Sequence, residues 1–240
     1  MPHLYFLADI HLSAEAPEIT AAFRRALAQI AASKPDGVYI LGDLFDAWLG
    51  DDLADKFARE IAASLAALPC PVWFQHGNRD FLLGEDFARE AGMTLLPERH
   101  VMEVAGRRIL IEHGDLLCIH DHGYLRLRKI LRHPATQALY RALPGVFKRR
   151  IAQKLRAQSK RRGARKDRRI TDADANEVAR ILEKYRCDML IHGHTHRAGE
   201  HDRRFVLGDW SAAGGVILQY RDGAWQLVQW PPCLSQESAR

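Results

Sequence analysis

Short apolar runs alternate with amphipathic stretches along the N-terminal part of the chain. Residues 4–9, 38–43 and 71–78 are apolar runs that end in polar residues, which is typical of buried strands. Between them, residues 17–33 and 53–67 carry apolar side chains at helical spacing. Strands that alternate with helices in this way predict an α/β fold.

Two later segments have the pattern of β-hairpins. Residues 100–115 contain two apolar runs around Ala105-Gly106, and residues 215–230 contain two more around Asp222-Gly223. The segment between these hairpins, residues 122–186, is helical in character. Within it, Pro144-Gly145 interrupts a stripe of apolar residues at a spacing of four, which consists of Leu139, Leu143, Phe147, Ile151 and Leu155.

The positive charge is concentrated in this helical segment. Residues 122–169 hold 17 Lys or Arg residues and one acidic residue, a net of +16, so the remainder carries −11 of the total of +5. We therefore predict a core formed by residues 1–121 and 170–240, and a basic amphipathic helical insertion, residues 122–169, laid over it as a lid. Such a charge fits nucleic acid, an anionic membrane surface or a phosphorylated ligand, or else a solvated helical face.

The sequence shows little sign of a targeting segment, a membrane span or paired cysteines. The N-terminus lacks the basic start and long apolar run of a secretory signal, and no apolar stretch approaches the roughly 20 residues that span a bilayer. The cysteines are scattered without a CxxC pair, which predicts reduced thiols. They are Cys70, Cys118, Cys187 and Cys233.

Polar motifs follow five of the apolar runs, at the points where strands are expected to end. In α/β sheets, functional groups gather at the carboxyl ends of strands. Each motif alone is weak, but five in order are hard to reach by chance. They are Asp9-Ile10-His11, Gly42-Asp43-Leu44-Phe45-Asp46, Gly77-Asn78-Arg79-Asp80, His113-Gly114-Asp115 and Gly193-His194-Thr195-His196.

These motifs supply nitrogen and oxygen ligands without thiolate, which suits Mn, Fe or Zn, and the share of hard oxygen favours Mn²⁺. One carboxylate can bridge two ions roughly 3.5–4 Å apart. Two dications, two carboxylates and a hydroxide sum to about +1, which attracts an anionic phosphate. Three further acids, Asp46, Asp80 and Asp115, are expected to hold histidines or shape turns. The candidate ligands are Asp9, His11, Asp43, Asn78, His113, His194 and His196.

The ordered set DxH, GDxxD, GNRD, HGD and GHxH resembles the calcineurin-like metallophosphoesterase family. Longer strings, from residue 3 to about residue 212, resemble family members that act on a UDP-linked diacylated glucosamine. The resemblance implies a two-sheet αββα sandwich with a helical lid and a pair of Mn²⁺ ions. The strings are LYFLADIHL, YILGDLFDAWLGDD, HGNRDFLLG and LIHGHTHR.

The resemblance also implies roles for individual residues. One metal takes Asp9, His11, Asp43 and His196, and the other takes Asp43, Asn78, His113 and His194, so that Asp43 bridges. Asn78, Arg79 and His194 are implied to be catalytic. Related enzymes can carry Asn where this chain has Gly163, which puts the contacts on the lid side in doubt. The implied substrate contacts are Asn78, Arg79, Asp121, Ser159, Lys166 and His194.

The implied reaction is attack of water on the α-phosphorus of UDP-2,3-diacylglucosamine. The products are UMP and 2,3-diacylglucosamine 1-phosphate, an intermediate of lipid A biosynthesis. The implied location is peripheral, at the cytoplasmic face of the inner membrane. The implied partners are the substrate and anionic lipids of that membrane surface, with no nucleic acid and no obligate protein partner.

Arg79 bears on the choice of substrate. Many metallophosphoesterases have His at this position, where it can protonate an alkoxide leaving group. An arginine, with a pKa of about 12.5–13.8, cannot serve as that acid, but it can grip phosphate oxygens. A phosphate leaving group, with a pKa of about 6, needs no such acid. Arg79 therefore favours pyrophosphate cleavage, unless it merely pairs with Asp43 or Asp80.

Two other functions fit parts of the sequence. A nucleic-acid phosphodiesterase would use the basic segment as a groove, although phosphate tracking does not need the apolar stripe beneath the charge. A non-enzymatic module that binds anionic lipid would not need a ligand set for two metals.

Overall fold

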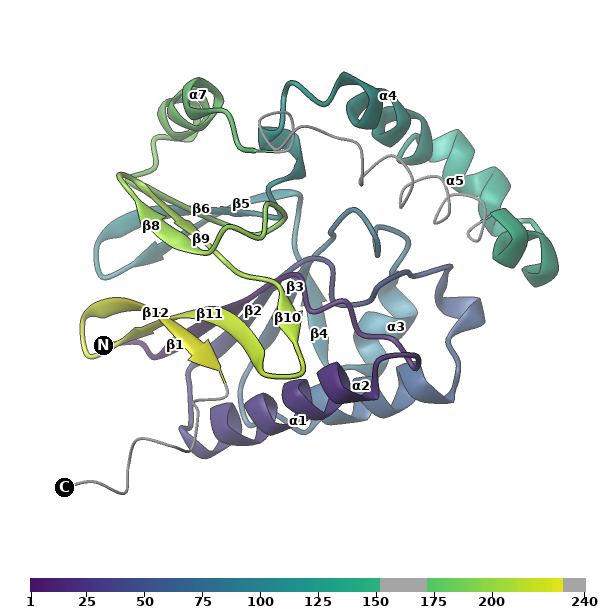
Figure 1. Ribbon diagram of the computed structural model, residues 1–240, viewed down its shortest axis with the longest axis horizontal. Helices are drawn as coiled ribbons and strands as arrows, with labels where there is room; N and C mark the ends of the chain where they lie inside the picture. The colour runs from purple at the N-terminus through teal and green to yellow at the C-terminus, as the bar shows by residue number, and fades with distance from the viewer. Residues whose placement is uncertain (152–171, 231–240) are drawn as a thin grey trace.

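The protein is described from a computed structural model that covers residues 1–151 and 172–230. Two β-sheets pack face to face, and helices cover their outer faces (Figure 1). The chain therefore has the predicted αββα sandwich. None of the helices in the described ranges is long and apolar enough to cross a membrane.

The first sheet contains a parallel set and an antiparallel set. β1, β2, β3 and β4 pair in parallel in that order, and β11 pairs antiparallel with β1 on the other side. β10 and β12 both pair antiparallel with β11. The strands are β1 (Leu4–Leu7), β2 (Gly37–Leu41), β3 (Val72–Gln75), β4 (Met93–Leu95), β10 (Trp210–Ser211), β11 (Gly214–Arg221) and β12 (Ala224–Trp230).

The second sheet has the order β5-β6-β7-β9-β8. β6, β7 and β9 are parallel neighbours, whereas β5 and β8 pair antiparallel at the two edges. The carboxyl ends of β6, β7 and β9 therefore lie at one edge of this sheet. The strands are β5 (Arg99–Val104), β6 (Arg107–Glu112), β7 (Met189–His192), β8 (Gly199–His201) and β9 (Arg204–Val206).

Three apolar clusters hold the layers together. The largest lies between the first sheet and its helices and includes Phe23 and Ile61. The second lies between the sheets, where Phe6 stacks on Tyr39, with ring centroids 4.9 Å apart. The third joins the second sheet to the outer helix α7. The outer helices are α1 (Pro17–Ala32), α2 (Lys56–Ala66), α3 (Glu85–Glu90) and α7 (Ala175–Tyr185).

Most predicted elements are present with shifted ends. The strand predicted over 71–78 ends at Gln75, because the following residues turn away to form a loop of the site. The helix predicted over 53–67 is instead a 3₁₀ turn, Asp51–Leu53, followed by α2, which ends at Ala66 and whose first turn is capped by the Asp55 side chain. Both predicted hairpins form. The prediction did not include α3 and β4, which are short and follow the third apolar run.

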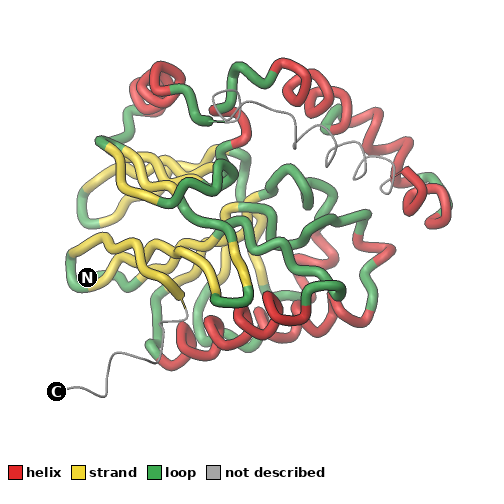
Figure 2. The backbone as a smooth tube through the Cα atoms, in the orientation of Figure 1, coloured by secondary structure: helices red, strands yellow, loops and turns green. Residues whose placement is uncertain are grey.

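The predicted insertion is helical where the structure describes it. Its elements are α4 (His122–Leu131), α5 (Pro134–Arg141) and a further helical segment at residues 145–151. α4 and α5 extend from the sandwich on the side where the parallel strands end (Figure 1). Loops gather on that side, between the sheets and the insertion (Figure 2). Residues 152–171 lie outside the described residues, and the role of the insertion as a lid stays a prediction.

Candidate active site

The five polar motifs converge at the edge where the parallel strands end. Asp9 follows β1, Asp43 follows β2, and Asn78 lies in the loop after β3. From the second sheet, His113 follows β6, and His194 and His196 follow β7. The sandwich thus brings candidate ligands from two facing sheets to one place, as the order of motifs predicted.

Five of the seven candidate ligands have left-handed backbone conformations. Their φ angles are 53° for Asp9, 54° for His11, 53° for Asp43, 67° for His194 and 56° for His196. Residues other than glycine adopt this conformation rarely, and when they do so together they commonly belong to a functional site. Backbone hydrogen bonds hold two of these turns, because the amide of Asp9 donates to Gly42 O and that of His11 donates to Asp43 O.

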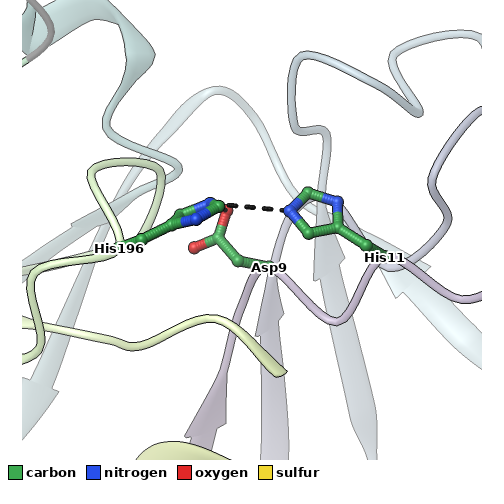
Figure 3. A group of neighbouring side chains, drawn as sticks. All are labelled: Asp9, His11 and His196. Carbon is green, nitrogen blue, oxygen red and sulfur yellow. Dashed lines mark hydrogen bonds and ion pairs between the residues drawn. The ribbon is translucent and has the colours of Figure 1, made fainter. Parts of the chain in front are cut away.

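One cluster is formed by Asp9, His11 and His196. Nε2 of His196 lies 3.4 Å from Asp9 Oδ1 and 3.5 Å from Nε2 of His11. Figure 3 shows the two imidazole rings facing each other across the Asp9 carboxylate. Nδ1 of His11 lies 3.9 Å from Asp43 Oδ2, which connects this cluster to the next.

A second cluster is formed around His113. Its Nε2 lies 3.8 Å from Asp43 Oδ1, 3.1 Å from Asn78 Oδ1 and 3.2 Å from His194 Nδ1. The other ring nitrogen of His113, Nδ1, lies 2.8 Å from the carbonyl oxygen of Leu41. That carbonyl can only accept a hydrogen bond, so it fixes Nδ1 as the protonated nitrogen and leaves Nε2 free for a metal.

The donor atoms fit divalent cations. Ligand atoms of Asp9, His11 and His196 lie within 4.8 Å of one another, and so do those of Asp9, Asp43 and His113. Asp9 Oδ1 and His11 Nδ1 are buried and have no hydrogen-bond partner in the described structure, which is costly unless a cation satisfies them. The first group contains three of the four ligands implied for the first metal, all but Asp43. The second group contains Asp43 and His113, which are two of the ligands implied for the second metal, together with Asp9.

The electrostatics of these groups fit the same interpretation. Burial, together with nearby Asp80 and Asp9, raises the pKa of Asp43 to about 7 against the opposing influence of His113. Burial lowers the pKa of His11 and of His194 to about 4 each, which keeps these imidazoles neutral at pH 7. Neutral imidazole is the form that ligates metals. A cation between the buried carboxylates would relieve their mutual repulsion.

Two glycines allow the loops to approach this closely. A Cβ atom on Gly77 would lie 2.1 Å from Asp43 Oδ1, and one on Gly193 would lie 2.3 Å from Asp9 Oδ2. Either would displace a candidate ligand. The glycines of the GNRD and GHTH motifs are therefore required by the close approach of backbone to carboxylate.

The three supporting acids have different roles. Asp80 is fully buried and accepts backbone hydrogen bonds from Asp43, Leu44, Phe45 and Gly77, which confirms that it shapes turns. Asp46 faces Arg79. It accepts from Nη1 of Arg79 at 2.7 Å. Arg79 also lies 3.7 Å from Asp43, and its side chain stays 41% exposed, so its ion pairs leave part of it open to solvent.

Asp115 contacts the insertion, because Tyr124 and Arg128 of α4 both donate hydrogen bonds to its Oδ2. Asp121 caps α4, since its Oδ1 accepts from the amide of Tyr124 at 3.0 Å. Its predicted substrate contact stays a prediction. Ser159, Lys166 and Gly163 lie outside the described residues.

Sequence reasoning missed Asp209, which follows β9. Its Oδ2 lies 3.5 Å from Nδ1 of His196, so it can orient that imidazole toward Asp9. The sequence does carry a signal for Asp209, because Val206-Leu207-Gly208-Asp209 repeats the pattern of apolar residues, Gly and Asp that ends at Asp43. The pattern does not stand out in the sequence, because β9 has only three residues and is too short to show a strand period.

The family of the chain follows from comparison with known proteins. The family model for the Calcineurin-like phosphoesterase matches residues 2–198. The chain therefore belongs to the calcineurin-like phosphoesterase family, a class of metal-dependent hydrolases, and the resemblance of its motifs is confirmed.

Two of its relatives carry the same specific name. A UDP-2,3-diacylglucosamine hydrolase of Escherichia coli O7:K1 is 46% identical over 237 residues, which cover 94% of this chain and 98% of that protein. The UDP-2,3-diacylglucosamine hydrolase of Shigella sonnei has the same identity and coverage. Among solved structures, an archaeal phosphodiesterase has a TM-score of 0.50 at 11% identity, covering 95% of this chain and 99% of its own, which shows the fold.

Proposed function

We propose that this protein hydrolyses the pyrophosphate bond of UDP-2,3-diacylglucosamine, giving UMP and 2,3-diacylglucosamine 1-phosphate in lipid A biosynthesis. The relatives of this name, which align over 94% of the chain, support the substrate. The observation that carries the proposal is the position of Arg79. It extends from the carboxylate and histidine cluster with a partly exposed side chain, and its guanidinium can grip phosphate oxygens but cannot act as a general acid.

The cluster would hold two divalent cations, for which we favour Mn²⁺. Asp9, His11 and His196 would hold one, and Asn78, His113 and His194 the other, with Asp43 between them. The ions would supply positive charge for phosphate oxygens and a nucleophile at neutral pH. The mixture of carboxylate, amide and imidazole donors without thiolate fits this group of metals.

Arg79 would bind and orient the phosphate that is attacked. Its Nη1 is held by Asp46 at 2.7 Å, which fixes the plane of the guanidinium. Its backbone amide donates to Asp43 Oδ1 at 2.8 Å, which fixes the turn on which it stands. A group held in this way stabilises negative charge that grows on phosphate oxygens, and it costs little reorganisation during the reaction. It supplies no proton, and the departing phosphate needs none.

The other predicted catalytic residues, Asn78 and His194, meet at His113. Their side chains both approach His113 Nε2, from two different loops. We propose that they position the same phosphate from the opposite side of the cluster. Asp121, Ser159 and Lys166 would contact the remainder of the substrate from the insertion.

The insertion would meet an anionic membrane surface. Of the large apolar side chains that are exposed in the described residues, all but Met1 belong to it: Ile130, Leu139, Val146, Phe147 and Ile151. Basic and exposed apolar residues together are typical of a segment that lies in the membrane interface. We propose a peripheral location at the cytoplasmic face of the inner membrane, where a diacylated substrate can enter beneath the insertion.

Nucleic-acid phosphodiesterase activity is the alternative. The same exposed apolar residues argue against it, because tracking a phosphate backbone does not require them. No obligate protein partner is proposed.

Substrate choice and the point of attack can be tested together. The protein, supplied with Mn²⁺ in ¹⁸O-water, is incubated with UDP-2,3-diacylglucosamine and, separately, with DNA. We expect turnover of the lipid alone, with ¹⁸O in UMP, because the acyl chains lie under the insertion and leave the uridine phosphate at the metals. Label in the lipid 1-phosphate would overturn this orientation, and turnover of DNA alone would overturn the substrate.

A further inference from the structure

Helix α4 of the insertion and the residue that caps its C-terminus, Arg132, contact two loops of the candidate site through arginines one turn apart. Nε of Arg128 donates to Asp115 Oδ2 at 2.6 Å, and Nη2 of Arg132 donates to the carbonyl oxygen of Gly77 at 2.7 Å. Both guanidinium groups also donate to the same oxygen, Oε1 of Glu98. A residue four positions along a helix lies on the same face, so this face of α4 is directed at the site.

The Gly77 carbonyl belongs to the peptide group that leads into Asn78. The amide of Gly77 donates to Asp80 Oδ1 at 2.8 Å, so Asp80 and Arg132 hold the residue from its two ends. The next residues supply Asn78 Oδ1 to the histidine cluster and the Arg79 amide to Asp43. The orientation of this one peptide group therefore bears on Asn78 and Arg79 together.

The contact of Arg132 is well shielded from water and requires a guanidinium. The Arg132 side chain is 13% exposed, and its guanidinium carbon lies 5.6 Å from the centroid of the Phe81 ring. Two of its nitrogens bind acceptors in different places, one on Glu98 and one on Gly77. A lysine ammonium is a single point charge and does not reproduce this fork.

We propose that Arg132 is a positioning residue, through which the docked insertion sets the Asn78–Arg79 turn for phosphate binding and for the second metal. The proposal rests on the proposed function, which makes Asn78 a metal ligand and Arg79 a phosphate contact. It assigns the insertion a part in assembling the site in addition to covering the substrate. Partners that orient metal ligands commonly contribute 10- to 100-fold in metal affinity or activity.

The test uses Arg132→Gln, Arg132→Lys and Arg132→Ala in the full-length protein, with Arg89→Gln as the control. Arg89 is an exposed helical arginine on α3 that pairs only with the neighbouring turn in the described structure. We expect Arg132→Gln and Arg132→Lys to lower kcat about 10- to 100-fold, with a much smaller change in KM. We expect the weaker of two Mn²⁺ affinities in calorimetric titrations to fall about tenfold. Guanidinium ion at low millimolar concentration should restore part of the activity of Arg132→Ala.

Two results would overturn the proposal. One is wild-type kcat and Mn²⁺ affinity in Arg132→Gln. The other is a loss that follows the unfolded fraction in thermal melts and is not relieved by guanidinium ion. Failure of the proposed function would look different, since the wild-type protein would then not turn over the UDP-linked lipid, while the Mn²⁺ titrations would still report on Arg132.

Discussion

Nζ of Lys148 lies 2.8 Å from Oδ2 of Asp52, although the lysine side chain is 2% exposed and that of the aspartate is 57% exposed. The ammonium also lies 5.6 Å from the centroid of the Tyr140 ring in α5. Lys148 belongs to the insertion, and Asp52 belongs to the 3₁₀ turn that follows the second strand. The insertion is thus attached to the core at a second point, away from α4.

Removal of this contact is expected to loosen the distal part of the insertion. In Asp52→Ala, the buried ammonium loses its counter-charge, at a cost of about 1–3 kcal/mol, nearer the lower figure because Asp52 is more than half exposed. Trypsin should then cleave within the basic segment faster than in the wild type. Asp86→Ala, which removes an exposed acid on α3, is the control. Equal cleavage rates in both variants and the wild type would show that the pair does not anchor the insertion.

Removal of the carboxylate between the clusters is expected to abolish most activity. Asp43 lies near both His11 and His113, so Asp43→Ala takes a ligand from both proposed metals and leaves two cations facing each other. We expect kcat in Mn²⁺ buffer to fall at least about 10³-fold. His196→Ala should cost less, because one metal keeps its full ligand set. The check is steady-state kinetics after chelator treatment and Mn²⁺ addition, and normal turnover of Asp43→Ala would refute the two-metal assignment.

Replacement of Arg79 is expected to affect the chemical step more than binding. Arg79→Ala should lower kcat by a larger factor than it raises KM, because the guanidinium meets charge that grows in the transition state. Arg79→His should not restore the rate, since a phosphate leaving group requires no acid. Kinetics with the UDP-linked lipid, compared with Arg89→Gln, decide this. An active Arg79→His enzyme with a new acidic limb in its pH profile would contradict the role of Arg79.

The strand pattern predicted an α/β fold because the buried strands are apolar throughout and end in polar residues, whereas the two-sheet sandwich followed only from the resemblance of the motifs to a known family. A strand such as β2 (Gly37–Leu41), which is buried on both faces, leaves a clear signal, and Asp43 after it marks the strand end. The candidate ligands were found for the same reason. Short edge elements such as β4 and β8 were not found, because three residues are too few to show a period.

The supporting contacts could not be predicted from local patterns. The partners of Arg132 and Lys148 lie 55 and 96 residues away in the sequence, and no pattern in the basic segment distinguishes these two cations from their solvated neighbours. Which cations are buried depends on which face of each helix meets the core. The charge pattern therefore predicted a basic surface, but it could not identify the few positive groups that are buried in contacts with the site and the core.

The exposed apolar and basic residues of the insertion are expected to bind anionic membranes together. Phe147 is 52% exposed, and the nearby Arg149 and Arg150 are exposed as well. Insertion of the Phe147 ring into the membrane and attraction of the two arginines to anionic lipids therefore act at one place. Each basic residue near an anionic surface contributes about 1 kcal/mol, screened by salt. Neutralising Arg149 and Arg150 as glutamines should therefore weaken partitioning roughly 10- to 30-fold at low salt. Phe147→Ser should weaken it at all salt concentrations, because the loss is apolar.

Flotation with phosphatidylglycerol vesicles measures both effects. The control is the double variant Arg59→Gln with Arg89→Gln, which removes two exposed charges from α2 and α3. Binding to neutral vesicles as strong as to anionic ones at every salt concentration would exclude the electrostatic part of this model.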